Sequence, residues 1–242
     1  MGSEMRREED WYENHYSSVN SSADCNSIAF RVLHRFLEKG FDSNSDLRIL
    51  EVGANIGEHV PFVSYPWKSY TATDLRMPST KKIAELANLS VDFKYADIER
   101  LPFASESFDR VISTCVFHHL SNPDEALREM LRVTTKGGAV SILLPNDPGI
   151  AYRLMRAVTT LRKARKLNLL QSVQLEHAKQ HRNHYLSLKT ILKDEAKDYS
   201  TKIDYFPFKF PLYNLNLISR IVIVKESRTS TLPVGAANKS DS

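Results

Sequence analysis

The sequence has few cysteines, no long apolar run and no apolar secretory segment, and each of these features excludes a class of protein. It has only two cysteines, Cys25 and Cys115, and they lack the paired spacing of a disulfide framework or a zinc motif. No apolar run approaches the roughly 20 residues that a membrane span needs. The segment 1–16 is charged and contains no apolar secretory region. We therefore expect a cytoplasmic protein.

The charge balance is weak as well. The 33 Lys and Arg residues exceed the 29 Asp and Glu residues by four in a chain of 242 residues. Because this surplus comes with no strongly basic tail and no RNA-binding module, we predict no nucleic-acid partner. A hydrophobic content of 42% is typical of a globular protein with a sizeable core.

The sequence does contain an alternation of short apolar runs with helix-like segments. Helical spacing is found in segments 23–40, 78–90 and 122–138. We expect Gly40 to end the first of these helices and Gly137-Gly138 to end the third. Strand-like runs occupy 47–53, 69–75, 91–97, 107–117, 139–145, 201–208 and 215–225. This alternation predicts an α/β fold with a doubly wound, mostly parallel sheet of seven strands.

The alternation breaks after Pro145. Segment 146–182 combines apolar residues at helical spacing with a dense cluster of Arg and Lys, which predicts a helical cap inserted into the fold. The predicted organisation is an N-terminal lid segment at 1–22, a core at 23–145, the cap at 146–182, a C-terminal helix with strands at 183–226, and a disordered tail at 227–242.

Glycine is scarce, with 8 residues in the chain, yet Gly53 and Gly57 lie directly after the first predicted strand. A strand, a glycine turn and a following helix are typical of a nucleotide site. The segment Gly53-Ala54-Asn55-Ile56-Gly57 does not have the spacing of G-x-G-x-x-G, and the carboxylate of Glu51 would repel a pyrophosphate. A carboxylate at this place favours a ligand with a positive group.

These residues resemble the first motif, E/D-x-G-x-G-x-G, of class I S-adenosylmethionine-dependent methyltransferases, with Asn55 in place of the middle glycine. The resemblance continues through YADIERLPFASESFDRVIS at 95–113, FHHL at 117–120 and LREMLRVTTKGGAVSILLP at 127–145. It covers roughly 24–145. It implies a Rossmann-like methyltransferase fold, S-adenosyl-L-methionine as cofactor, and methyl transfer to an oxygen or nitrogen of a small acceptor.

The resemblance also implies cofactor-binding roles for residues at the ends of successive strands, where open α/β sheets bind their ligands. Glu51 and the turn of Gly53, Asn55 and Gly57 would face the methionine part of the cofactor. Asp74, followed by Leu75, would bind the ribose hydroxyls. Asp97 would bind the adenine amino group, Ile98 would pack on the ring, and the methyl group would point past Cys115.

Two aromatic residues near the N-terminus, Tyr12 and Tyr16, are four positions apart and would share one face of a helix. We interpret them as part of a lid over the cofactor. The alternative is that they seal the edge of the core.

Several histidines follow or flank the predicted pocket. His118 and His119 come after the fourth strand and are the candidate catalytic residues, since histidine can act as a general base near neutral pH. The alternative is that they only line the site. His177, His181 and His184 are expected to share a helix face, and His181, His184 and Tyr185 to shape the acceptor pocket. A metal site is conceivable there, but we predict no metal.

The positive cap and the histidine-rich segment favour a small-molecule or glycan-type acceptor, such as a nucleotide-linked or lipid-linked sugar. We also consider contact of the basic cap with an anionic membrane surface. The sequence does not determine the oligomeric state. Two other functions stay open, a non-catalytic S-adenosylmethionine-binding module and a nicotinamide-dependent dehydrogenase.

Overall fold

The computed structural model describes residues 28–41 and 46–225, which form a seven-stranded sheet in the order β3-β2-β1-β4-β5-β7-β6. The strands are β1 Leu47–Val52, β2 Trp67–Asp74, β3 Val91–Tyr95, β4 Phe108–Thr114, β5 Thr134–Pro145, β6 Ser200–Phe206 and β7 Ile218–Val224. Strands β1 to β5 pair in parallel, whereas β7 is antiparallel to both of its neighbours. The predicted doubly wound, mostly parallel sheet of seven strands is confirmed.

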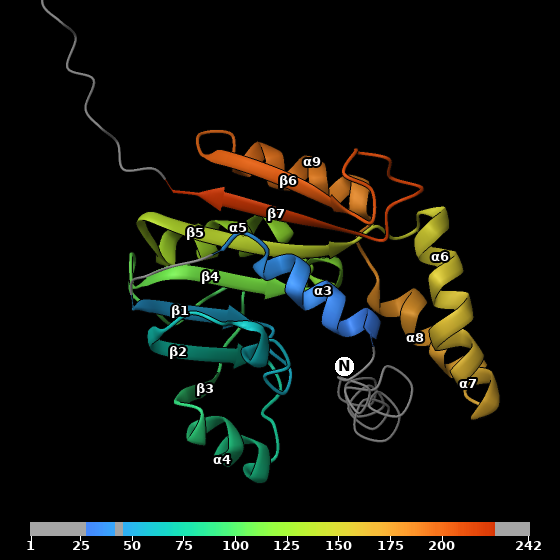
Figure 1. Cartoon of the computed structure of the whole chain (residues 1–242), viewed down its shortest axis with the longest axis horizontal. Coiled ribbons are helices and arrows are strands. Elements are labelled where there is room, and N and C mark those ends of the chain that lie inside the picture. The colour runs from blue at the N-terminus through green and yellow to red at the C-terminus, as the bar shows by residue number, and fades with distance from the viewer. Residues whose placement is uncertain (1–27, 42–45, 226–242) are drawn as a thin grey trace, which may run out of the picture.

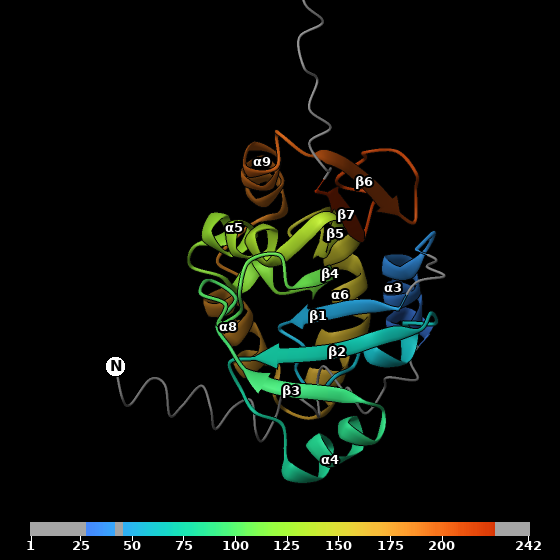
Figure 2. The ribbon, with the colours of Figure 1, turned by 90° about the vertical axis from the view of Figure 1, so that its left-hand side faces the viewer.

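Helices cover both faces of this sheet. The α-helices of the described residues are α3 Ile28–Glu38, α4 Thr80–Asn88, α5 Pro123–Val133, α6 Ile150–Arg156, α7 Arg162–Lys166, α8 Leu170–Gln180 and α9 Tyr185–Glu195. Two short 3-10 helices, η3 Val60–Phe62 and η4 Phe117–His119, and one π-helical segment, η5 Ala157–Leu161, complete the set in the described residues. Figure 2 shows α5 and α9 on one face, α3 on the other, and α4 beside the edge strand β3.

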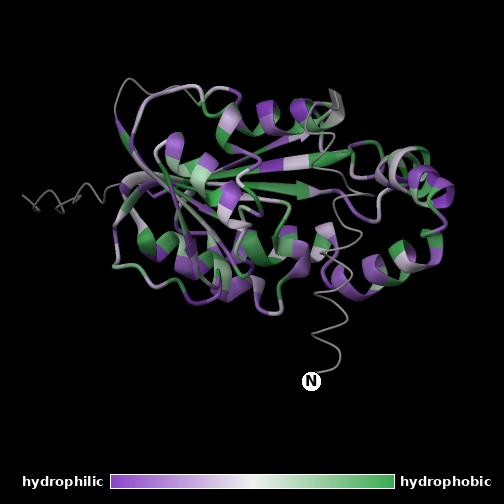
Figure 3. Cartoon of the chain, turned by 90° about the horizontal axis from the view of Figure 1, so that it is seen from below, coloured by the Kyte–Doolittle hydropathy of each residue, from purple (hydrophilic) through white to green (hydrophobic). Residues whose placement is uncertain are grey.

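The core has one apolar layer on each face because the strands are apolar on both sides, as parallel strands between helices must be. Along β1, Leu50 and Val52 belong to the layer under α5 and α9, while Ile49 belongs to the layer under α3. Figure 3 shows the same arrangement, with largely green strands between helices that carry both purple and green segments. None of the described helices is long and apolar enough to cross a membrane.

The segment 146–182 forms α6, η5, α7 and α8, which lie beyond one end of the sheet. In Figure 1 the arrows of β1, β2 and β4 point toward these helices. The carboxyl ends of the parallel strands, where ligands bind in such sheets, therefore face this segment. We call α6 to α8 the cap.

Two local expectations were wrong. The glycine turn after β1 leads only into the single 3-10 turn η3, because Pro61 and Pro66 interrupt the segment before β2. The pair Gly137-Gly138 does not end a helix, since α5 already ends at Val133 and the chain turns extended at Thr134. Thr134 pairs with Phe108 of β4, so the two glycines lie within β5.

Candidate functional site

The turn after β1 has a backbone that favours glycine. Gly53 and Gly57 have φ values of +70° and +76°, and Asn55 between them has +51°, all in the left-handed region. A Cβ added at Gly53 would lie 2.2 Å from Cγ2 of Val116, and one at Gly57 would lie 2.6 Å from Cδ2 of Leu86. The two glycines are therefore needed both for the turn and for the close approach of its neighbours.

This turn is bound to the end of β2. The backbone N–H of Ala54 donates to the carbonyl of Thr73 at 2.9 Å, and that of Asn55 donates to Oδ2 of Asp74 at 2.9 Å. The other carboxylate oxygen of Asp74 accepts the N–H of Arg76 at 3.0 Å. Backbone donors thus orient Asp74 at the carboxyl end of β2, where its half-buried carboxylate keeps further lone pairs. The next residue, Leu75, is 54% exposed.

Glu51, at the end of β1, has one unpartnered oxygen. Its side chain is buried, and Oε2 accepts the hydroxyl of Tyr70 at 2.6 Å, while Oε1 is buried without a hydrogen-bond partner. Burial raises the pKa of Glu51 to about 7, against the lowering effects of His59 and the Tyr70 hydroxyl. A positive group beside Oε1 would restore the ionised form.

The loop after β3 carries the predicted adenine residues. Asp97 is exposed, and its Oδ1 accepts the N–H of Glu99 at 2.9 Å, so backbone contacts orient this carboxylate too. Ile98 is 6% exposed and packs in the core layer that contains Leu101 and Phe108. Its side chain therefore supports the loop from the protein side in this structure.

Cys115 lies at the end of β4 with φ +57°, and its N–H donates to the carbonyl of Leu143 at 2.9 Å. Burial raises the pKa of its thiol to about 12. A thiol with that pKa stays protonated at neutral pH, which argues against a nucleophilic role for Cys115.

Four histidines and an acid gather between the end of β4 and the cap. His118 and His119 come from η4, His177 from α8, and His181 from the end of α8. The ring of His181 lies between two others, with centroids 3.7 Å from His177 and 4.2 Å from His118. The acid is Asp147, which lies two residues after β5; its Oδ2 is 2.7 Å from Nδ1 of His181 and 3.3 Å from Nε2 of His177.

The protonation states in this cluster follow from burial and contacts. Burial, with the neighbouring imidazoles, holds the pKa of His118 well below its ordinary value and lowers that of His119 to about 4. Burial opposes ionisation of Asp147 as well, but the contacts with His177 and His181 outweigh it and hold the pKa of Asp147 below its ordinary value. The cluster thus contains neutral imidazoles at His118 and His119, close to one ionised carboxylate.

Asp147 is a residue that the sequence patterns did not single out. It follows the carboxyl end of β5, so the rule that pointed to Asp74 and Asp97 also applies to it. Its contacts with His177 and His181 bridge 30 and 34 positions of the chain and depend on how the cap folds.

The expectation that His177, His181 and His184 share a helix face was wrong. Helix α8 ends at Gln180, and His184 is the extended residue before α9, where it is exposed. Tyr185 is 1% exposed and belongs to the core layer, where its ring stacks on Tyr213 with centroids 5.7 Å apart. Of the three predicted acceptor-binding residues, the structure places only His181 in the cluster. The predicted lid residues Tyr12 and Tyr16 lie outside the described residues.

A cavity of about 500 Å³ opens between the cap and the end of β5. Its wall includes Asp147 and His177, together with Tyr152, Leu154 and Arg156 of α6. Arg153 is a second arginine in this wall. The cavity thus combines apolar side chains with two arginines, and it borders the histidine cluster.

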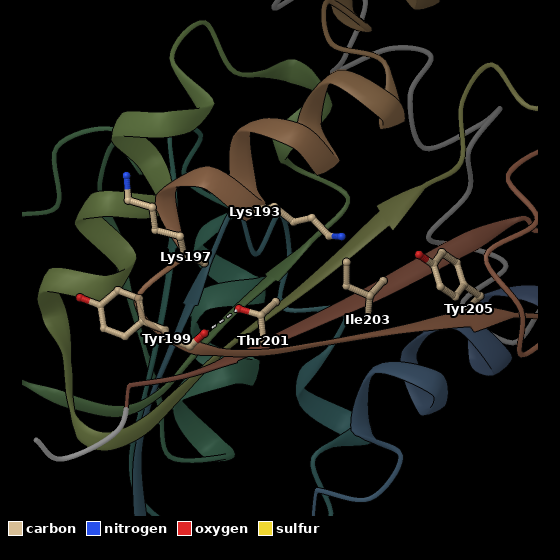
Figure 4. A pocket seen from close by; sticks show the side chains of 7 residues that line it. Lys193, Lys197, Tyr199, Thr201, Ile203 and Tyr205 are labelled. Carbon is tan, nitrogen blue, oxygen red and sulfur yellow. Dashed lines mark hydrogen bonds between the residues drawn. The ribbon is translucent and has the colours of Figure 1, made fainter. Parts of the chain in front are cut away.

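Another cavity, of about 470 Å³, lies along the edge strand β6. Figure 4 shows Lys193 of α9 and Lys197, which follows that helix, above a row formed by Tyr199, Thr201, Ile203 and Tyr205 at and along β6. This cavity belongs to the edge of the sheet that is farthest from β1, β2 and β3 in strand order. It is therefore separate from the glycine turn and the strand-end acids.

Comparisons with known proteins agree with this geometry. Residues 50–142 match a protein-family model described as a methyltransferase domain. The chain is 28% identical over 121 residues to the methyltransferase YcgJ of Bacillus subtilis, a match that covers 46% of each chain. It is 37% identical over 111 residues to a malonyl-[acyl-carrier protein] O-methyltransferase of Erwinia pyrifoliae, covering 44% of this chain and 40% of the other.

A solved structure is similar over most of the chain. It is a SAM-dependent methyltransferase of Thermotoga maritima, with a TM-score of 0.54, 16% identity, and coverage of 92% of this chain and 96% of that one. At this identity the likeness shows the fold. The sequence matches are partial, since the chain spans less than half the length of the curated relatives that it matches.

Proposed function

Since the chain carries a class I S-adenosylmethionine-dependent methyltransferase domain, we propose that it transfers the methyl group of S-adenosylmethionine to an oxygen or nitrogen of a small acceptor. One observation carries this proposal. The glycine turn is hydrogen-bonded to Asp74 beside a buried Glu51 whose Oε1 has no partner. A ligand with a vicinal diol and a positive amino group matches both acids.

The residues present fit this cofactor. Gly53 and Gly57 leave no room for a side chain at the turn, so the backbone itself borders the site. Asp74 would bind the ribose hydroxyls, Asp97 the adenine amino group, and Glu51 would lie toward the methionine ammonium. Fixed acids facing a cationic ligand cost little reorganisation on binding. The family and the fold imply the same cofactor.

The reaction needs positioning more than acid–base chemistry. When bound, the cofactor supplies a methyl group on a sulfonium, which is already a good electrophile. The chain's part is to hold the acceptor in line with that methyl, and such alignment lowers a barrier by roughly 7–11 kcal/mol. His118 and His119 lie after β4 and are kept neutral by burial, so either could take the proton that an acceptor hydroxyl or amine loses.

We place the acceptor in the cavity between the cap and β5. Its apolar wall and its arginines favour an acceptor with an apolar part and an anionic group, such as a nucleotide-linked or lipid-linked sugar. The relative from Erwinia pyrifoliae is named for an acceptor that is also more than a bare sugar, a malonyl group on an acyl-carrier protein.

A membrane surface is a second partner that the cap favours. Ile150, Leu154 and Val158 follow one another every four residues and are 56–66% exposed, and the exposed Arg153 and Arg162 lie close to them in the chain. Sedimentation with anionic vesicles tests this. The wild type should sediment and Val158→Glu should stay in solution; equal behaviour of both would remove the membrane from the proposal.

Calorimetric titration with S-adenosylhomocysteine tests the cofactor site. Asp74→Ala should weaken binding about a hundred-fold, because a carboxylate bonded to two hydroxyls contributes roughly 3 kcal/mol. Asp92→Ala is the matched control, since Asp92 is an exposed acid of β3 paired with Lys94. No heat with the folded wild type, or equal affinity in both variants, would contradict the proposal.

Transfer of a labelled methyl group from the cofactor into candidate acceptors distinguishes an enzyme from a non-catalytic binding module. Cofactor binding without transfer to any sugar, lipid or acyl acceptor would favour the binding module. A titration with nicotinamide dinucleotides tests the dehydrogenase alternative, and we expect no binding there.

A further inference from the structure

The histidine cluster under the cap contains buried ligand atoms that hydrogen bonds do not satisfy. Nε2 of His177 is buried and has no hydrogen-bond partner, although Oδ2 of Asp147 lies 3.3 Å away. Buried polar atoms in native proteins are nearly always paired, so an orphaned nitrogen calls for an explanation such as an ion. This nitrogen points to a group that the protein's own atoms do not supply.

We propose that Asp147, His177 and His181 bind one divalent transition-metal ion, of the class of Zn²⁺. One ligand atom from each residue lies within 4.8 Å of the other two. Ligand atoms on a tetrahedral zinc ion are about 3.4 Å apart. Oδ2 of Asp147 already lies 3.3 Å from Nε2 of His177 and 2.7 Å from Nδ1 of His181, so small side-chain rotations would reach that geometry. Two imidazoles and a carboxylate suit such an ion, whereas Mg²⁺ prefers oxygen ligands.

A second set of ligands, formed by His118, His119 and His181, has similar spacing. We assign the ion to the Asp147 set for two reasons. The carboxylate of Asp147 would neutralise part of the ion's charge, whereas three imidazoles would not. In addition, Asp147 and His177 line the cavity between the cap and β5, whereas neither His118 nor His119 does.

The location gives the ion an open coordination position. Asp147 and His177 both line the cavity between the cap and β5, so the side of the ion that faces the cavity has no protein ligand from this set. Three protein ligands with one open position are typical of catalytic sites, while structural sites are closed. If the proposed function holds, an oxygen of the acceptor would take that position. Only this step of the inference rests on the proposed function.

The first experiment measures the metal itself. Full-length protein treated with a chelator is titrated with Zn²⁺ by calorimetry and with Co²⁺ by visible absorption. We expect one ion per chain, and for Co²⁺ the absorption bands of protein-bound metal. His177→Ala and His181→Ala should each weaken binding at least about a hundred-fold. Mg²⁺ should not compete.

Matched variants assign the ligands. His119→Ala removes a member of the alternative set, and His184→Ala removes an exposed histidine outside both sets. Both variants should keep the wild-type affinity within about threefold. His177→Gln provides a second test should His177→Ala fold poorly, because it keeps the size and a polar end but loses the imidazole.

Three outcomes would overturn the proposal. They are the absence of stoichiometric binding by the wild type, retained binding in His177→Ala and His177→Gln, and loss of binding in His119→Ala. The same samples are titrated with S-adenosylhomocysteine. If cofactor binding persists without metal binding, only this inference fails; if metal binding persists without cofactor binding, the proposed function fails.

Discussion

Two buried carboxylates at the same edge of the sheet behave in opposite ways. Glu51 ends β1 and is 1% exposed, and Asp147 follows β5 and is 5% exposed. The pKa of Glu51 is raised to about 7 because burial exceeds the effect of its few partners. The pKa of Asp147 is held below its ordinary value because two imidazoles outweigh burial.

The difference shows that burial alone does not decide the charge of an acid. Glu51 has one hydroxyl donor from its own chain and one bare oxygen, so its ionised form depends on a positive group from outside. Asp147 obtains its partners from the cap of the same chain. The charge of Glu51 therefore depends on a group from outside the chain, whereas the charge of Asp147 is supported by contacts within the chain.

The largest effect on stability is expected from a substitution in the glycine turn that follows Glu51. Gly53→Ala should destabilise the fold by about 3–5 kcal/mol, because an alanine would be strained at the left-handed φ of this residue and its Cβ would clash with Val116. Gly137→Ala is the control, since Gly137 has φ +81° but open space around it, and it should cost about 1 kcal/mol. Urea unfolding measures both, and equal losses would exclude the clash as the cause.

The next effect concerns the charge of Glu51. Its folded pKa is raised, so the stability it contributes is present below its ordinary pKa near 4.5 and is lost as the pH rises through about 7. Glu51→Gln should therefore stabilise the protein by about 3 kcal/mol at pH 8 and by almost nothing at pH 4. It should also weaken binding of S-adenosylhomocysteine. Unfolding curves at the two pH values check the sign; a variant less stable than the wild type at pH 8 would contradict it.

Asp147 should show the opposite dependence. Its folded pKa is lowered, so its contribution is present above its ordinary pKa near 3.8 and is lost as the pH falls through the folded value. In chelator-treated protein, Asp147→Asn should cost about 2 kcal/mol at pH 7, and the difference from wild type should shrink below pH 4. Unfolding measured from pH 3 to 8 follows it. A constant difference would show that the charge of Asp147 is not responsible.

The smallest effect is expected when Glu51 loses its hydrogen-bond donor, the hydroxyl of Tyr70. Tyr70→Phe removes the only hydroxyl that donates to Oε2 of Glu51 among the hydrogen bonds of the described residues. It should cost about 1 kcal/mol and move the pKa of Glu51 above about 7, since a donor to the ionised form is lost. Carboxyl-carbon NMR during a pH titration reads that pKa directly. An unchanged pKa would mean that burial sets it without help from the hydroxyl.

Local patterns in the sequence predicted where the residues of the first region lie, and the family resemblance supplied the roles proposed for them. Glu51, Gly53 and Asp74 each stand at the end of an apolar run, and the rule for parallel sheets brings such ends together. The structure bonds the turn to Asp74, as that rule requires. The binding roles of these residues stay predictions, because no ligand contact has been observed.

The second region could not be predicted in the same way. His184 was expected beside His181 because of its spacing, but α8 ends between them, and helix ends are poorly determined by periodicity. Asp147 had the right position in sequence, yet nothing near it pointed to its partners. Its two imidazoles arrive from a helix whose placement depends on tertiary packing, which local spacing does not encode.

The way in which the cap is attached to the sheet has a consequence for how the chain could diversify. The N–H of Tyr185 donates to the carbonyl of Asp147 at 3.0 Å, so residues 148–184 leave and rejoin the sheet at one point. The N–H groups of Arg182 and Asn183 donate to the carbonyl of His118 at 3.0 and 3.2 Å, at the same place. A segment with such close ends can be exchanged as one module. Under the proposed function, grafting another cap between these anchor points would change acceptor preference and leave the strand ends proposed to bind the cofactor unchanged.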